Sequence, residues 1–214
     1  MDELFLYDRD NGLFKQILKQ STVMQGRYFI STNGGSDLNS SNIDAIILDT
    51  LKGMVDAEQK YPCVICIPPY STFSTETGTT RENIYFSLFF ICTTGYTGQN
   101  KVKQPHPSTM ISTHHVWQDW KDMKECATNF MEVFDKVTRK LKIGLLPVCN
   151  FVNVDIDSMQ IQRLSKLNND ELSGVHLSFR SSLAGDNCDL NDYPPDVLDI
   201  IVLPPTSIHP LHLH

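Results

Sequence analysis

One cysteine pair has the spacing of thiol chemistry, Cys63-Val64-Ile65-Cys66. A redox-active CxxC pair places one thiol at a helix N-terminus, which lowers its pKa. Here the motif lies in a β-rich run over 61–67, where residues three apart point to opposite faces of a strand. A zinc site would need further ligands, and the sequence holds no second CxxC. We therefore predict that the six cysteines are reduced and mostly core residues: Cys63, Cys66, Cys92, Cys126, Cys149 and Cys188.

Two carboxylates and several histidines are the residue types that can hold a metal ion. Asp155 and Asp157 stand at i and i+2, so both face one side of a strand and can offer oxygen ligands to a divalent cation. The same spacing describes the solvated face of any amphipathic strand. Imidazoles that can add to such a set are His106, His114, His115, His209, His212 and His214. We favour an interpretation with no metal site and no cofactor, and keep a metal-dependent enzyme using Asp155, Asp157 and histidines as an alternative.

Motifs for nucleophilic catalysis or phosphate binding are absent from the sequence. It has no GxSxG and no Walker A loop, and the glycine-rich stretch Asn33-Gly34-Gly35-Ser36 has no lysine after it. We therefore expect no enzymatic activity. The two tryptophans suggest contacts instead. Trp120 falls on the apolar stripe of a helix and is predicted to be core, whereas Trp117 beside it is predicted to be an exposed contact residue.

Composition bounds the remaining function classes. The chain has 214 residues, 41% hydrophobic and 20% charged, which suits one globular domain, and its net charge of −7 argues against binding a nucleic-acid duplex with the whole surface. A basic cluster at the end of one predicted helix is interpreted as complementing the helix dipole: Lys136, Arg139, Lys140 and Lys142. We see no signal peptide and no apolar run long enough to span a bilayer, and expect folding in a reducing, cytosol-like compartment.

Helical periodicity is strongest over 116–141. Apolar residues recur there at steps of three and four: Val116, Trp120, Met123, Ala127, Phe130, Phe134, Val137 and Leu141. Shorter helices are predicted over 13–18 and, after the capping residues Ser40-Ser41-Asn42, over 43–54. Gly144 stands where a glycine ends a helix.

Strand patterns separate the helices. The nearly continuous apolar run over 84–93 predicts a central strand buried on both faces. Short strands are expected over 27–31 and over 61–67, the second stopped by Pro68-Pro69, with loops over 70–82 and 94–112. The alternation over 148–157 predicts a half-buried strand, and 159–167 with 172–183 predict a hairpin. The expected fold is α+β, an antiparallel or mixed sheet packed by a long amphipathic helix and shorter N-terminal helices.

The last residues differ from the rest of the chain. Pro194-Pro195 and Pro204-Pro205 bracket an apolar run, and the prolines prevent a helix. We predict one domain over 1–190 and an extended, proline-rich arm over 191–214 that contacts another molecule. The predicted contact residues of the arm are Val197, Leu198, Ile200, Ile201, Val202 and Leu203. Pairing of this run as an edge strand within its own subunit is the alternative.

The order of these elements resembles a known class of proteins. Two short helices are followed by Pro62-Cys63-Val64-Ile65-Cys66-Ile67-Pro68, the strand over 84–93, the long helix, and a hairpin that ends in Leu172-Ser173-Gly174-Val175-His176-Leu177-Ser178-Phe179-Arg180. This pattern, with Cys188 after it, resembles neck proteins of the tail-completion or tail-terminator type in tailed bacteriophages. It is similar to versions from phages of gut Bacteroidales, including crAss-like phages. It covers about residues 10–190, and the arm departs from it.

The resemblance implies a mechanical function. The chain would be a virion protein of the head–tail connector, folded in the host bacterial cytoplasm and assembled into a cyclic homo-oligomer. It would dock to neighbouring portal, neck or tail proteins, contact no membrane, and let genomic DNA pass through its lumen without sequence-specific contact. The acidic charge agrees with a lumen that repels DNA. A small host-side binding module is the second alternative, beside the metal-dependent enzyme.

Overall fold

The computed structural model describes residues 4–31, 43, 45–47, 49–50, 61–76, 79–93, 113–142, 151–167 and 172–184. Its fold is α+β, as the sequence predicts. The helices are α1 (Leu4–Tyr7), α2 (Leu13–Gln20) and α4 (Thr113–Lys142). The strands are β1 (Tyr28–Ile30), β2 (Cys63–Glu76), β3 (Thr79–Thr93), β4 (Phe151–Leu167) and β5 (Leu172–Ala184). They form one mixed sheet in the order β1-β2-β3-β5-β4.

Strand β3 occupies the middle of the sheet, which confirms the expectation from its apolar run. It pairs antiparallel with β2 on one side and with β5 on the other, while β1 pairs parallel with β2. Both faces of β3 are buried, because Phe90 belongs to one core cluster and Phe89 to the other. A continuous apolar run is therefore what this position in the sheet requires.

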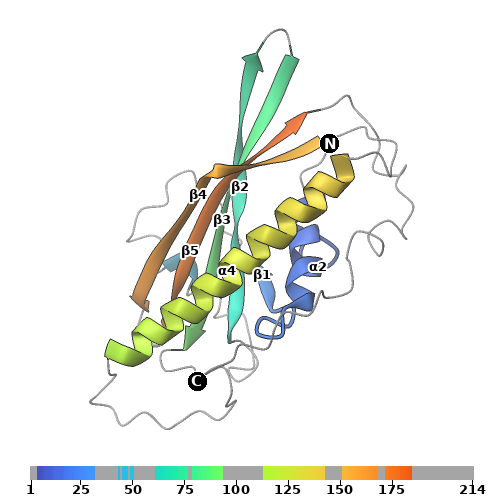
Figure 1. Ribbon diagram of the computed structural model, residues 1–214. Coiled ribbons are helices and arrows are strands. Elements are labelled where there is room, and N and C mark those ends of the chain that lie inside the picture. Colours follow the sequence, from blue (N-terminus) through green and yellow to red (C-terminus); the bar gives the residue numbers. More distant parts are fainter. Residues whose placement is uncertain are drawn as a thin grey trace.

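Helix α4 crosses one face of the sheet diagonally, with α2 beside it (Figure 1). The predicted stripe supplies most of this contact, since Met123, Ala127, Phe130, Phe134 and Val137 are all buried in the larger core cluster. Aromatic rings fill the space between α2, α4 and the sheet. The ring of Phe14 lies 5.2 Å from those of Phe130 and Phe134 and 5.1 Å from that of Phe86.

One prediction for this stripe is wrong. Trp120 is half-buried and lies outside the core cluster. It occupies the first part of α4, where the helix has passed the end of the main core. The stripe continues there by helical periodicity, but the surface that it meets is the end of β4.

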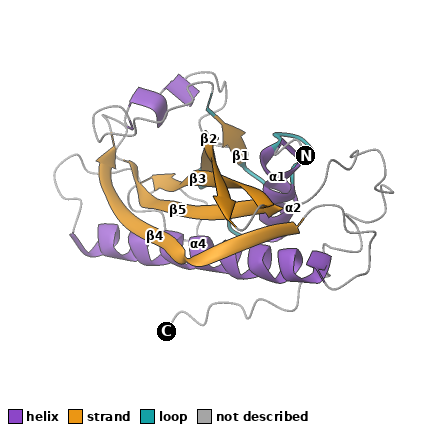
Figure 2. Cartoon of the chain, turned by 90° about the horizontal axis from the view of Figure 1, so that it is seen from above, coloured by secondary structure: helices purple, strands orange, loops and turns teal. Residues whose placement is uncertain are grey.

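The second face of the sheet is covered by the other predicted helix. Residues 43, 45–47 and 49–50 are helical and lie on the side of the sheet opposite α4 (Figure 2). Ile46 and Ile47 pack there in a smaller cluster with Cys63, Ile65, Ile67, Phe89, Ile91 and Leu172. The sheet is therefore a middle layer with apolar residues on both sides.

Strand β2 is twice as long as expected. Pro68-Pro69 do not stop it, and residues 70–76 and 79–82 continue β2 and β3 as a hairpin instead of forming a loop. A break in register between Ile67 and Tyr70 accommodates the prolines, because a bulge needs no ladder hydrogen bond from their nitrogens. The hairpin projects beyond the rest of the sheet (Figure 1).

Strand β4 also corrects a boundary. The segments expected as separate strands over 148–157 and 159–167 form one strand from Phe151, paired antiparallel with β5 as the predicted hairpin requires. The pairing shifts between Asp155 and Gln160, so the alternation of faces changes there. Val154 before the shift is buried, whereas Ile156 within it is 43% exposed, so the regular alternation expected over 148–157 does not continue through the shift.

Several predictions concern residues outside the described part of the chain. These are the loop over 94–112, the helix end at Gly144, and the arm over 191–214 with Val197, Leu198, Ile200, Ile201, Val202 and Leu203. In the described part, no helix is long and apolar enough to cross a membrane.

Candidate functional site

Trp117 and Trp120 form an aromatic cluster with Arg163 near the start of α4. The indole rings meet edge to face at 5.7 Å, and the guanidinium carbon of Arg163 lies 4.9 Å from the Trp117 ring and 5.5 Å from the Trp120 ring. Trp117 is 58% exposed, as the sequence predicts. The cluster joins the helix to β4, so its three side chains come from segments distant in the sequence.

A hydrogen bond fixes the inner half of this cluster. The indole Nε1–H of Trp120 donates to the backbone carbonyl of Leu164 at 2.6 Å. The bond satisfies the polar group of a half-buried ring and anchors α4 to the residue next to Arg163. The exposed ring of Trp117 therefore lies on the surface against Trp120, whose own position this hydrogen bond fixes.

Such a cluster is suited to recognise another protein. Trp and Arg are enriched among the residues that dominate protein–protein binding, and a ring with restricted motion loses little entropy on binding. The simpler interpretation is that Arg163 and Trp117 only clamp α4 to β4. The two interpretations differ in what they predict for a Trp117 variant, because a clamp acts on stability and a contact residue acts on assembly.

A shallow hollow of about 520 Å³ opens where the sheet bends, between the base of the β2–β3 hairpin and β4. Polar side chains of four strands line it. Ser87 Oγ on β3 lies 2.5 Å from Nε2 of His176 on β5, and the imidazole stacks on Phe89 with ring centroids 4.5 Å apart. Burial lowers the pKa of His176 to about 4, so the ring is neutral near pH 7 and shares a hydrogen bond with the Ser87 hydroxyl.

An ion pair between Arg180 and Asp155 also lies in the hollow. Arg180 donates to the Asp155 carboxylate through Nε at 3.0 Å and also through Nη2, and its hydrogen bonds to Asp155 and Tyr85 raise the pKa of Arg180. Tyr85 stacks on Tyr70 at 4.8 Å. A serine nucleophile would need a base that is itself oriented by a third group. Of the two carboxylates that line the hollow, Asp155 is instead engaged by Arg180, and Asp157 is exposed at the bend of β4.

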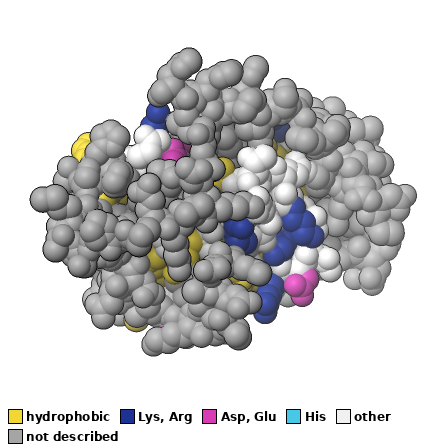
Figure 3. All heavy atoms as spheres, turned by 90° about the horizontal axis from the view of Figure 1, so that it is seen from below, with side chains coloured by type: hydrophobic (Ala, Val, Ile, Leu, Met, Phe, Trp, Pro, Cys, Tyr) yellow, Lys and Arg dark blue, Asp and Glu magenta, His cyan; other side chains and the backbone are white. Residues whose placement is uncertain are grey.

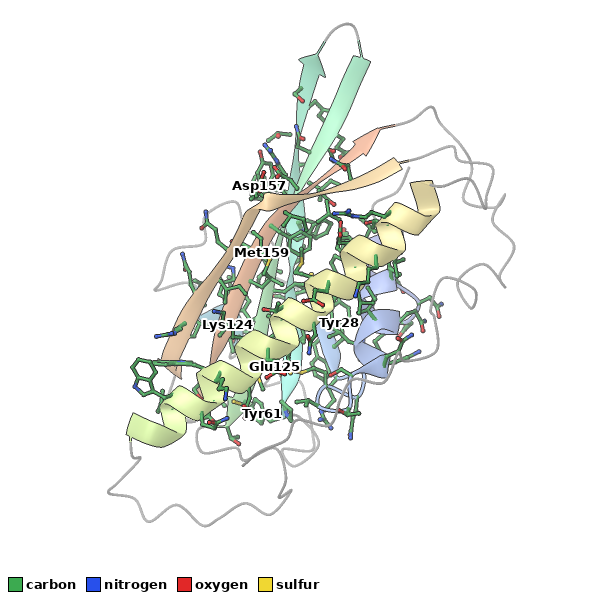
Figure 4. All side chains as sticks on the ribbon, in the orientation of Figure 1. Tyr28, Tyr61, Lys124, Glu125, Asp157 and Met159 are labelled. Atoms are coloured by element: carbon green, nitrogen blue, oxygen red, sulfur yellow. The ribbon has the colours of Figure 1, made fainter. Side chains whose placement is uncertain are left out.

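Ser158 holds the irregular part of β4. Its hydroxyl donates to the Asp155 carbonyl at 2.6 Å and accepts from the backbone N–H of Arg180 at 2.8 Å. These bonds replace ladder contacts that the register shift removes. Asp157 lies at this bend near the hairpin base, whereas Met159 lies further along over the sheet (Figure 4) and packs on the main core.

Of the predicted metal ligands, the structure describes the side chains of Asp155 and Asp157. Asp155 and Asp157 both line the hollow, but Asp155 is bound by Arg180. Among the described residues, no group of three or more His, Cys, Asp or Glu side chains is arranged to hold a metal. The structure does not describe the side chains of the histidines that were predicted as further ligands: His106, His114, His115, His209, His212 and His214.

The CxxC residues lie on opposite faces of β2, as predicted. Cys66 belongs to the core cluster under α4 and Cys63 to the cluster on the other face, and both are fully buried. Burial raises the pKa of Cys66 to about 12, so its thiol is protonated and a poor nucleophile. Cys92 is buried too, and Cys126 is half-buried. Cys149 and Cys188 are outside the described residues.

The described members of the predicted basic cluster have acidic neighbours on their own helix. Arg139 lies 2.8 Å from Asp135, and Lys136 lies 4.0 Å from Glu132. The side chains of Lys140 and Lys142 are not described. Elsewhere, several Lys and Arg side chains gather on one part of the face seen from below, next to an acidic group (Figure 3). In these described regions, the basic side chains therefore lie next to acidic side chains.

The projecting hairpin exposes two aromatic rings. Phe73 is 71% exposed and Tyr70 is 45% exposed. Tyr70 is paired with Tyr85 and Phe73 with Glu82, so by strand alternation the two rings lie on opposite faces of the hairpin. Large apolar groups on a projecting element indicate an interaction surface.

Comparison with known proteins finds no matching family model, no matching curated protein and no matching solved structure. The candidate site therefore rests on this chain alone. Sequence reasoning found Trp117 but missed its partner Arg163, since nothing in the sequence shows that β4 ends beside α4. It also missed Ser87 with His176, and Phe73 on the hairpin. A lone phenylalanine in a Ser- and Thr-rich stretch is the signal that could have identified Phe73.

Proposed function

We propose that the chain is a structural subunit that assembles with copies of itself into a ring in the neck of a tailed bacteriophage. The observation that carries the proposal is the exposed ring of Trp117, held between Arg163 and Trp120. An exposed tryptophan loses contact with water only when a partner covers it, and a partner gains a large apolar area at small entropic cost.

Two further features support assembly. The β2–β3 hairpin projects from the sheet away from the start of α4 (Figure 1), and it bears the exposed rings of Phe73 and Tyr70. A cyclic ring is built from heterologous contacts, in which one surface of a subunit meets a different surface of the next. A subunit with two separate exposed aromatic sites meets that requirement.

The link to a phage neck comes from the sequence resemblance. The order of elements on which it rests is an α+β order with a central strand, a long helix and a closing hairpin, and the fold has this order. In this proposal the ring docks to portal, neck or tail proteins, and DNA passes through its lumen. The net charge of −7 favours passage without binding.

Replacement of Trp117 tests the contact. We expect Trp117→Ala to weaken self-association by about 2 kcal/mol or more, roughly 30-fold, while the melting temperature of the monomer changes little. Native mass spectrometry across a dilution series measures the association. Ile156→Ala is the matched control, because Ile156 is also a large exposed apolar residue on the β4 side of the sheet, at 43% exposure.

The result can contradict the contact in two ways. If Trp117→Ala assembles as the wild type does, this surface is not an interface. If the variant melts far below the wild type as a monomer, Trp117 is a clamp between α4 and β4, and its exposure says nothing about partners.

A further inference from the structure

Among the described strands, none pairs with the outer edge of β2 over most of its length. In the described part of the chain, β1 pairs with β2 only over Val64–Cys66, and Ser31 adds one hydrogen bond to the Cys66 carbonyl. No described strand lies outside Tyr70–Glu76, although these residues are fully paired with β3 on their inner side. Alternate residues of such an edge direct N–H and C=O groups outward, where another strand can bind them.

In the sequence of Tyr70–Glu76, the features that usually protect an edge against strand addition are few. Edge strands are commonly protected by charges, prolines or bulges. Here Pro68-Pro69 and the bulge lie before Tyr70, and the following Tyr-Ser-Thr-Phe-Ser-Thr-Glu has one acidic residue, at its end. The opposite edge, β4, differs because its register shift is flanked by Asp155 and followed by Arg163. Of the two edges, the one on β2 is the better template.

The chain contains a segment that matches this template. Val197 to Leu203 is a run of seven residues between two proline pairs, and Tyr70 to Glu76 is also seven residues. The run is rich in β-branched side chains, which favour strands and pair well with aromatic residues across a ladder. The exposed rings of Phe73 and Tyr70 offer such cross-strand neighbours, one on each face.

The end of β5, from which the chain continues toward the arm, lies at the same end of the sheet as the β2–β3 hairpin. Leu183 stands next to the last residue of β5 and pairs with Glu82, which belongs to the β2–β3 hairpin. The chain beyond Ala184 therefore begins near the hairpin. A contact between the arm of one subunit and the hairpin of the next uses two different surfaces. It is therefore heterologous, which a closed ring requires.

We infer that Val197–Leu203 of one copy adds as a strand to the Tyr70–Glu76 edge of β2 in a second copy. The inference rests on the proposed ring and names one of its contacts. Main-chain hydrogen bonds supply affinity, and the proline pairs at both ends of the run limit the register. Many such contacts act together in a ring, so each can be weak by itself.

Photocrosslinking from the hairpin tests the inference in the 214-residue chain. Benzoylphenylalanine replaces Phe73, which is 71% exposed, so the change of ring leaves the fold intact. Isotopically heavy and light copies are mixed, irradiated and digested. We expect crosslinked peptides that join residue 73 of one isotope to residues 193–203 of the other. The same probe at Ile156, on the β4 side, is the control and should give no crosslink to the arm.

Each other outcome overturns the inference. Crosslinks only between peptides of the same isotope show that the arm docks on its own subunit. Crosslinks from residue 73 to another surface show a different occupant, and no crosslink shows that the edge is free. The native mass separates this failure from failure of the proposed function. A ring without the 73-to-arm crosslink rejects the docking alone, whereas a chain that never assembles rejects both.

Discussion

The guanidinium of Arg163 on β4 covers the exposed ring of Trp117 on α4, with its central carbon 4.9 Å from the ring centroid. The pair joins two elements at the end of the sheet, outside the main core. Its position explains why the stripe of α4 divides into two parts. Met123 to Val137 stabilises the fold, while Trp117 and Trp120 shape a surface.

Phe130→Ala tests the core part of the stripe. Phe130 is 3% exposed and lies between Phe14 and Phe90, so its removal leaves a cavity among close-packed rings. We expect a loss of about 3–5 kcal/mol, which lowers the melting temperature on the order of 10 °C. Thermal unfolding followed by circular dichroism measures it. A variant that melts within a degree or two of the wild type would show that the ring is not in this position.

The cysteine pair should be structural. We expect the double variant Cys63→Ala, Cys66→Val to lose about 1–3 kcal/mol of stability through core packing and to keep its assembly state. In the native wild type, a thiol reagent should leave Cys63, Cys66 and Cys92 unmodified, because all three are buried. Mass mapping of the modified cysteines provides the test. A stably folded double variant that no longer assembles would instead give the pair a functional role.

Gly174 should tolerate no side chain. A Cβ at this position would lie 2.0 Å from the Phe90 carbonyl oxygen and 3.0 Å from the Ile91 Cα, so β3 and β5 could not keep their spacing. We expect Gly174→Ala to cost about 1–3 kcal/mol by chemical denaturation. Ser182→Ala on the same strand is the control, with a much smaller loss. Equal stability of the two variants would contradict the close approach of the strands.

The pH dependence of stability should include a contribution from His176. Burial lowers its pKa to about 4 from 6.5, so the unfolded chain binds a proton at a higher pH than the folded chain does. Stability from this group is present above pH 6.5 and falls as the pH decreases to about 4, by about 3 kcal/mol. Urea unfolding of the wild type and His176→Gln between these pH values measures it. The inference fails if the variant loses as much stability over this range as the wild type.

The sequence was informative where one pattern determined the environment. The 3.6-residue stripe from Met123 to Val137 predicted a packed face of α4, and the apolar run over 84–93 predicted a central strand, because each pattern extends over many residues. The opposite faces of Cys63 and Cys66 followed from strand alternation alone.

The errors arose where tertiary structure overrides local preference. Pro68-Pro69 end most strands, but a bulge absorbs them and lets the Thr-rich residues beyond pair as a hairpin. Trp120 continues the helical stripe, yet the core ends before it. Ser87 meets His176 only because Phe89 is the direct partner of His176 across β3 and β5, and this register cannot be read from the separate strands.

The native mass of the 214-residue chain is the sharpest test of assembly into a ring. It is measured for the purified chain alone and for the chain mixed with phage portal and tail proteins, to which the proposed neck ring would dock. We expect one closed species with a fixed number of copies, either alone or on its neighbours, and expect Trp117→Ala to abolish it. A chain that remains a monomer in both samples would contradict the claim that it acts by assembling into a ring.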